Sequence, residues 1–127
     1  MATITCVLVE DEPLAYQMIS GYIAQRKELQ LIAKIDNLKD FYSKIRATAP
    51  SIVFLDFRIL GFDGDITRML GRIPKRSIVV SISACPLSHF QNMYGIKVTG
   101  KIYELLKPFS FEKFNRCIND LISEGII

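Results

Sequence analysis

The sequence predicts a single α/β domain of the doubly wound type, in which helices cover both faces of a five-stranded parallel sheet. Three observations predict it. Five short apolar runs rich in β-branched residues recur along the chain, and stretches with helical periodicity separate them. The length of 127 residues suits one domain with a substantial core. Because right-handed crossovers lay alternating units into one open sheet, we expect a single domain over residues 1–127.

The five apolar runs are the expected strands. They are apolar on both faces, which is typical of parallel strands that helices cover on two sides. The last run is the least regular, because Glu104 interrupts it. The expected strands are residues 4–9, 31–35, 52–55, 78–82 and 102–106.

Helices are expected between the strands, where apolar residues recur every three or four positions. The first follows Pro13, since proline is favoured in the first turn of a helix. Asn37 and Ser110 are candidate N-caps of the second and the last helix. The fourth is the weakest, because proline and glycine interrupt the segment 86–100. The expected helices lie within residues 14–23, 38–45, 64–71, 88–94 and 111–122.

Composition and charge argue against several classes of protein. The net charge of +3 is too small to indicate nucleic-acid binding by itself. The sequence lacks an apolar run of about 18 residues, so no membrane span is expected, and its start does not resemble a signal peptide. Cys6, Cys85 and Cys117 are too far apart for a zinc motif or a disulfide framework. Their pattern fits a reducing compartment, and we expect a cytoplasmic protein.

Polar residues follow the expected strands at their carboxyl ends, where doubly wound sheets bind their ligands. Glu10 and Asp11 follow the first strand, Asp56 the third, Ser83 the fourth and Lys107 the fifth. Crowded carboxylates repel one another unless a cation joins them, and Mg²⁺ prefers oxygen ligands. An aspartate beside Mg²⁺ can attack phosphorus, while a lysine and a hydroxyl stabilise the phosphoryl oxygens. This set of residues therefore indicates a site that accepts a phosphoryl group.

Four segments at these strand ends resemble the receiver domain of two-component response regulators. Their order and approximate spacing match the family, and the resemblance covers essentially the whole chain. The last segment most resembles receivers of the LytTR class, which carry a DNA-binding domain after the receiver. The segments are VLVEDEP (7–13), LDFRILGFDG (55–64), SISA (81–84) and LLKPFSFEKF (105–114).

The resemblance implies a flavodoxin-like fold with strand order 2-1-3-4-5 and a role in phosphorelay signal transduction. Asp56 would accept a phosphoryl group from a sensor histidine kinase in a Mg²⁺-dependent reaction. Ser83 would take the place of the switch hydroxyl, and Lys107 that of the lysine that pairs with phosphate. Beyond self-phosphorylation from a phosphodonor and autodephosphorylation at Asp56, no enzymatic activity is implied. A cis peptide bond is implied before Pro108.

The resemblance also implies a set of metal ligands. Asp11 and Asp56 would bind Mg²⁺, with Asp11 the more direct member of the acidic pair. Glu10 would act through water, and the backbone carbonyl of Arg58 would face the metal.

The implied partners are a sensor histidine kinase and an effector domain or protein target, and the family's habit adds a homodimer. DNA would be contacted only indirectly, through a C-terminal domain, and no membrane partner is expected. Two interpretations remain open: a stand-alone receiver, or a receiver from a longer regulator.

The chain departs from the family pattern at three places. Ile59 and Leu60 stand where the family has Met and Pro, although Gly64 keeps the family's glycine. Glu104 occupies the switch position that is normally aromatic, and neighbouring Tyr103 should face the other side of the sheet. The segment 85–101 lacks the family's firm helical pattern. Glu104 and the segment 86–100 motivate an alternative function, a receiver-like interaction module that is independent of phosphorylation.

A second alternative comes from the stretch Asp63-Gly64-Asp65-Ile66-Thr67, which fits the D-x-D-x-T pattern of haloacid-dehalogenase-like phosphatases. That chemistry needs its first aspartate at the end of a strand. Here the strand already ends at Asp56, so Asp63 and Asp65 are better explained as acids at the start of a helix.

Overall fold

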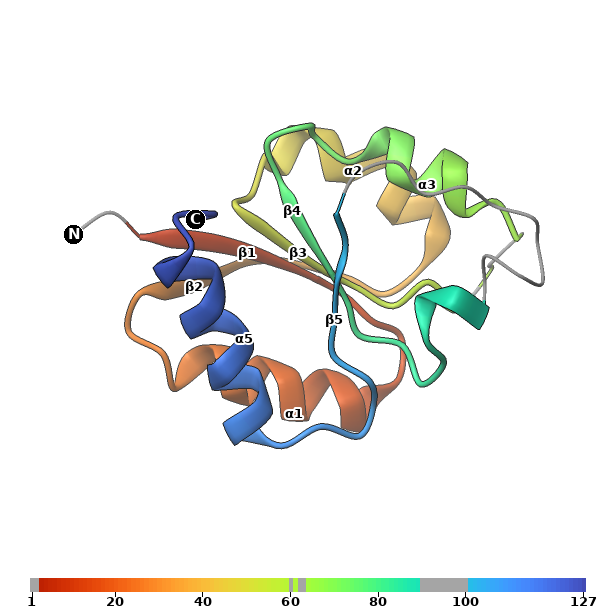
Figure 1. The fold of residues 1–127 in the computed structure, drawn as a ribbon. Coiled ribbons are helices and arrows are strands. Elements are labelled where there is room, and N and C mark those ends of the chain that lie inside the picture. The colour runs from red at the N-terminus through yellow and green to blue at the C-terminus, as the bar shows by residue number, and fades with distance from the viewer. Residues whose placement is uncertain (1–2, 60, 62–63, 90–100) are drawn as a thin grey trace.

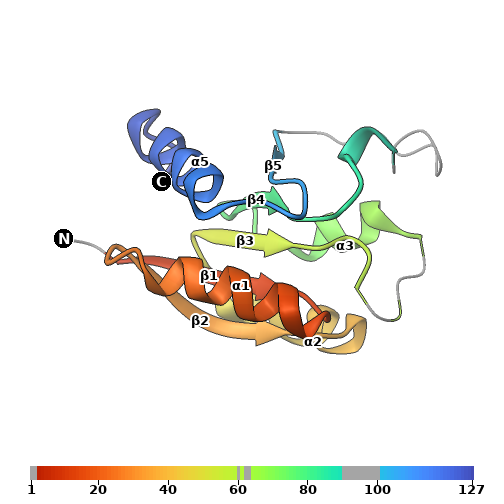
Figure 2. The same cartoon turned by 90° about the horizontal axis from the view of Figure 1, so that it is seen from below.

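The computed structural model describes residues 3–59, 61, 64–89 and 101–127. Five parallel strands form one sheet in the order β2-β1-β3-β4-β5, with helices on both faces (Figures 1 and 2). The predicted doubly wound fold and its strand order are confirmed. None of the helices within the described ranges is long and apolar enough to cross a membrane.

The bounds of the elements follow the predictions closely, with differences at the edges of the sheet. The strands are β1 (Ile4–Val9), β2 (Leu29–Ile35), β3 (Ile52–Leu55), β4 (Ile78–Ser81) and β5 (Tyr103–Glu104). The helices are α1 (Pro13–Ala24), α2 (Leu38–Thr48), α3 (Ile66–Arg72) and α5 (Phe111–Ser123). Residues 87–89 are helical, and the rest of the expected fourth helix lies outside the described residues.

Strands β2 and β5 differ most from the sequence prediction. β2 begins two residues earlier, because Leu29 and Gln30 pair with Ile4 and Thr5 at the start of β1. β5 is shorter than the expected 102–106, since this edge strand pairs with β4 over two residues only. Periodicity alone could not set these limits, because pairing with the neighbouring strand decides where an edge strand ends.

Strand side chains alternate between two apolar clusters on opposite faces of the sheet. In β1, Val7 and Val9 belong to the cluster with α2 and α3, whereas Cys6 and Leu8 belong to the cluster with α1 and α5. Figure 1 shows these helix pairs on the two sides of the sheet. The first cluster takes Phe41, Ile45, Ile66 and Met69 from its helices, and the second takes Ile19, Ile23, Phe114, Ile118 and Leu121. With both faces covered, polar groups gather at the ends of the strands.

Side-chain caps fix where two helices begin. The Asn37 side chain accepts the Asp40 N–H at 2.8 Å at the start of α2, and Ser110 accepts the Lys113 N–H at 3.1 Å at the start of α5. Each cap satisfies a backbone donor that has no partner within its own helix. Both predicted N-caps are therefore confirmed.

Candidate functional site

The backbone ladder places the carboxyl ends of the strands side by side. The Asp56 N–H donates to the Val9 carbonyl at 3.0 Å, so Asp56 lies next to the end of β1 and its following acids. The Lys107 N–H donates to the Ser83 carbonyl at 3.2 Å, just beyond the pairing of β4 with β5. Because these bonds extend past the ends of the strands, the backbone itself brings the predicted site residues to one rim.

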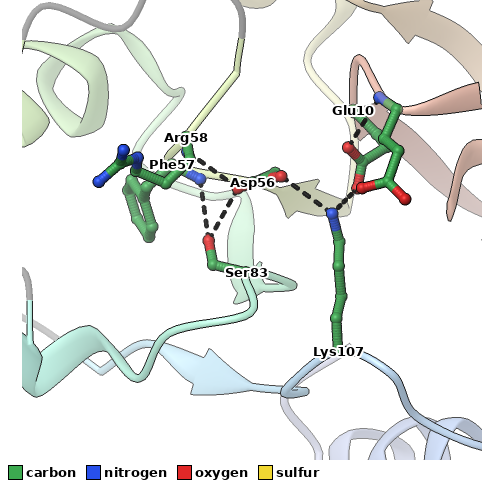
Figure 3. A network of polar contacts seen from close by, with 7 residues as sticks. Glu10, Asp56, Phe57, Arg58, Ser83 and Lys107 are labelled. Carbon is green, nitrogen blue, oxygen red and sulfur yellow. Dashed lines mark hydrogen bonds and ion pairs between the residues drawn. The ribbon is translucent and has the colours of Figure 1, made fainter.

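The Asp56 carboxylate is almost fully buried, with 6% of the residue exposed, and both of its oxygens have donors (Figure 3). Oδ1 accepts the Arg58 N–H at 2.8 Å and the Ser83 hydroxyl at 3.0 Å. Oδ2 accepts the Lys107 ammonium at 2.9 Å. A buried carboxylate needs such partners to remain charged. These three donors therefore hold the Asp56 carboxylate in a fixed orientation.

Ser83 is fully buried and uses its hydroxyl in two directions. The hydroxyl donates to Asp56 and accepts the Phe57 N–H at 3.1 Å. Since a hydroxyl has one hydrogen to donate, that hydrogen is committed to Asp56 in this arrangement. Any new acceptor near Asp56 would compete directly for it.

Lys107 joins the acidic groups that follow two different strands. Its ammonium forms ion pairs with Asp56 and with Glu10, which is itself fully buried (Figure 3). Burial raises the pKa of Glu10, and the hydrogen bond from Lys107 offsets only part of this effect. For Lys107, burial by itself would lower the pKa, but the hydrogen bonds to Glu10 and Asp56 raise it. The ammonium therefore stays charged and compensates the two carboxylates.

Three carboxylates form a set that could hold a metal ion. One oxygen each from Glu10, Asp11 and Asp56 lies within 4.8 Å of the others. Mg²⁺ keeps its ligands at about 2.1 Å, so two ligands on opposite sides of the ion are about 4.2 Å apart. The observed spread fits this donor set when one carboxylate binds through a water molecule. The residues present are thus suited to Mg²⁺ by charge, by donor type and by spacing.

Some contacts of the site were not anticipated from the sequence. The Arg58 N–H bonds to Asp56 two residues before it, a pattern known from Asx turns that the sequence could have suggested. The pairing of Lys107 with Glu10 also went unforeseen, although a lysine facing two acidic strand ends would be expected to compensate both. The carbonyl of Arg58 as a metal ligand stays a prediction. The cis peptide bond between Lys107 and Pro108 is confirmed.

Two of the departures from the family pattern, at Ile59 and at Glu104, lie within the described residues. Ile59 is 1% exposed and packs in the cluster under α2 and α3, so it serves the core where the family has Met. Leu60 lies outside the described residues. Tyr103 packs with Leu105 in the opposite cluster, so it does not share a face with Glu104, as predicted from strand alternation.

The D-x-D-x-T stretch does not lie at the end of a strand. The Asp65 side chain accepts the Arg68 N–H at 2.8 Å and caps α3, which begins at Ile66 rather than at the expected residue 64. Gly64 precedes the cap with a φ of 82°, a conformation that favours glycine. Asp63 lies outside the described residues. Asp65 thus acts at a helix start, which argues against the phosphatase interpretation.

Comparison with curated proteins finds response regulators. The chain is 32% identical over 123 residues to an uncharacterized response regulatory protein of Vibrio cholerae, and 27% identical over 122 residues to the sensory transduction protein LytT of Enterococcus faecalis. These matches cover 94% and 93% of this chain but 45% and 48% of the relatives, so the chain spans about half the length of the curated relatives it matches. The similarity to LytT agrees with the resemblance to the LytTR class. No protein-family model matches the chain.

Comparison with solved structures finds the same fold. The signal receiver domain of the putative response regulator NarL from Mycobacterium tuberculosis has a TM-score of 0.73 at 17% identity, and the match covers 94% of this chain and 96% of that one. The receiver domain of a sensor histidine kinase from Pseudomonas aeruginosa has a TM-score of 0.74 at 18% identity, covering 96% and 99%. That receiver has a magnesium ion coordinated in its active site cleft.

Proposed function

We propose that this chain, a receiver domain of the response regulators, accepts a phosphoryl group on Asp56 and changes its interactions as a result. The observation that carries the proposal is the convergence on one buried carboxylate of a lysine from the segment after β5, a hydroxyl from the segment after β4 and two adjacent carboxylates that follow β1. A polar residue that merely ends a strand would not need this set of partners. This convergence also favours phosphoryl transfer over a phosphorylation-independent interaction module.

In the proposed reaction, an Asp56 carboxylate oxygen attacks the phosphorus of a phosphohistidine on a sensor kinase. An O–P bond forms, the N–P bond breaks, and its electron pair returns to the imidazole nitrogen of the donor. Lys107 lies within hydrogen-bond distance of Asp56, so its ammonium can pair with the incoming phosphoryl oxygens. The hydroxyl of Ser83 can turn from the carboxylate to one of these oxygens. Hydrolysis of the acyl phosphate would reset the domain.

Glu10, Asp11 and Asp56 would hold a Mg²⁺ ion, joined by the carbonyl of Arg58. The ion supplies positive charge that neutralises the phosphoryl oxygens during transfer. Lys107 would remain a second source of positive charge beside these carboxylates, since it pairs with Glu10 and Asp56. Residues 1–127 would form one receiver domain that carries this reaction.

The relatives suggest the wider setting of the switch. Because they are about twice as long as this chain, we propose that the receiver acts on an effector region that follows it, DNA-binding as in the LytTR class. A homodimer and a cytoplasmic location belong to the same proposal. The reaction takes place on the chain's own aspartate, so no separate substrate is turned over.

The proposed acceptor is tested with acetyl phosphate and Mg²⁺, followed by intact-mass spectrometry. The wild type should gain one phosphoryl group, and Asp56→Asn should gain none. Omitting Mg²⁺ or adding EDTA should suppress the modification of the wild type. Equal labelling of wild type and Asp56→Asn would show that Asp56 is not the acceptor. Labelling in EDTA would show that the reaction does not require a metal ion.

A further inference from the structure

Glu104, the acidic residue at the usual position of the switch aromatic, makes a specific contact with the segment after β4. Its Oε2 accepts the N–H of Leu87 at 3.0 Å, although the two residues are 17 positions apart. Glu104 lies in β5, and Leu87 is the first helical residue after the loop that follows β4. The contact therefore links the edge strand of the sheet to the segment that carries Ser83.

The Leu87 N–H needs an acceptor from elsewhere in the molecule. The first N–H groups of a helix have no partner within that helix, and a side chain at the preceding position often caps one of them. Here Pro86 precedes Leu87, and its side chain has no acceptor atom. Glu104 supplies the missing oxygen from the neighbouring strand. The acidic residue thus has a structural role that an aromatic side chain without an acceptor atom could not perform.

The loop 83–87 is held at both of its ends by residues of the same edge segment. At one end, the Ser83 carbonyl accepts the Lys107 N–H at 3.2 Å, and at the other end the Leu87 N–H donates to Glu104. Glu104 itself is fixed to the sheet, because it pairs with Ser81 in the parallel ladder. Only three residues separate Ser83 from Leu87, so a displacement of the Ser83 backbone would reach the contact with Glu104 over a short length of chain.

We propose that the Glu104 carboxylate latches the loop 83–87 in its unphosphorylated position and releases Leu87 when Asp56 carries a phosphoryl group. This inference rests on the proposed function. The Ser83 hydroxyl donates to Asp56 in the present arrangement, and a phosphoryl group there offers it new acceptor oxygens. As Ser83 follows these oxygens, the short loop moves while Glu104 stays with β5. The bond to Leu87 then lengthens and breaks.

The proposed contact should affect how tightly the domain binds a phosphoryl mimic. A contact made in only one of two states stabilises that state, so its removal shifts the equilibrium toward the other. Glu104→Ala should therefore favour the phosphorylated arrangement. Beryllofluoride, which mimics the phosphoryl group on an aspartate, should bind the variant more tightly by about fivefold, the factor expected for loss of one helix cap.

The experiment combines amide hydrogen exchange at Leu87 with a beryllofluoride titration in the presence of Mg²⁺, both followed by NMR. Glu104 is exposed, so truncation to Ala leaves no cavity and the variant should fold. In the unmodified state, Leu87 should exchange about fivefold faster in Glu104→Ala than in the wild type. Glu124→Ala, which removes the same charge from an exposed site after α5, should match the wild type in both measurements.

Two results would each overturn the latch. Unchanged Leu87 exchange in Glu104→Ala would show that the contact does not protect this amide. Unchanged or weaker beryllofluoride binding by Glu104→Ala would show that the contact is not specific to the unphosphorylated state. Absence of beryllofluoride binding in the wild type would instead overturn the proposed phosphoryl acceptor together with the release step, and the exchange result would still show whether Glu104 holds Leu87.

Discussion

The ammonium nitrogen of Lys107 lies 2.9 Å from Oδ2 of Asp56, a contact between residues 51 positions apart, and it also pairs with Glu10. One cation thus joins the carboxylates that follow β1 and β3 to the segment after β5. Charge compensation and the proposed chemistry depend on the same atoms. Substitutions of these residues should therefore change both the stability of the domain and its reaction with a phosphoryl group, and the two effects can be measured separately.

Lys107→Met should destabilise the domain when no metal is present. The substitution keeps most of the apolar stem but leaves Glu10 and Asp56 without their cation. We expect the free energy of unfolding at pH 7 to fall by about 2 kcal/mol, the range for hydrogen bonds of charged groups. Saturating Mg²⁺ should restore most of the loss, because the ion would bind the same carboxylates.

Urea denaturation with and without MgCl₂ measures both effects of Lys107→Met. Lys113→Met, an exposed substitution in α5, serves as the control. Similar losses in the two variants, or a loss that Mg²⁺ leaves unchanged, would contradict the assigned role of Lys107 in charge compensation.

Ser83→Ala should lower stability and also weaken the response to the phosphoryl mimic. Losing the bond to Asp56 should cost about 1 kcal/mol of unfolding free energy. Ser77→Ala is a matched control, because the buried Ser77 hydroxyl donates to the Pro50 carbonyl at 2.6 Å, away from the site. Calorimetry should show similar destabilisation, whereas beryllofluoride affinity should fall only in Ser83→Ala. An equal fall in beryllofluoride affinity in both variants would mean that the loss of affinity comes from destabilisation of the domain and not from the contact with Asp56.

Glu10→Gln should stabilise the domain in a pH-dependent way in the absence of metal. The folded state raises the pKa of Glu10 above its ordinary value of 4.5, mainly through burial. The favourable contribution of the protonated group is complete below pH 4.5 and is lost as the pH rises through the folded pKa. Above pH 4.5 the raised pKa of Glu10 therefore lowers the stability of the wild type, and the amide removes this cost.

Thermal denaturation of wild type and Glu10→Gln in EDTA across pH 4 to 8 tests whether the substitution stabilises the domain. The variant should melt at a higher temperature at pH 7, and the difference should shrink toward pH 4. Glu112→Gln, on the exposed face of α5, provides the comparison. A Glu10→Gln variant that melts lower than the wild type at pH 7 would show that the Lys107 pairing outweighs burial.

Asp65→Ala separates the helix-cap explanation from the phosphatase interpretation. Loss of the bond to the Arg68 N–H should destabilise the domain by about 1 kcal/mol. Phosphoryl incorporation from acetyl phosphate should stay at the wild-type level, since Asp56 and its partners are unchanged. Mass spectrometry and urea denaturation give the two readouts. A loss of phosphoryl incorporation at unchanged stability would assign Asp65 a chemical role.

Local sequence by itself indicated most of the described elements of this protein and singled out Asp56 as the candidate acceptor. Apolar runs predicted β1 and β3 with their observed bounds, and Asn37 and Ser110 marked helix starts. These features depend on burial and on hydrogen bonds within a few residues, so they can be read locally. Asp56 could be singled out because strand ends of a parallel sheet converge on one rim.

Tertiary structure alone decided the contacts that join distant segments. The length of β5 depends on how many of its residues pair with β4. The pairing of Lys107 with Glu10 depends on the position of the segment that follows this edge strand. From the sequence, Glu104 interrupts an apolar run and departs from the family pattern, but neither observation showed that it accepts the N–H of Leu87. Such contacts have no periodic signal, because they arise from the spatial order of the strands and not from their spacing in the chain.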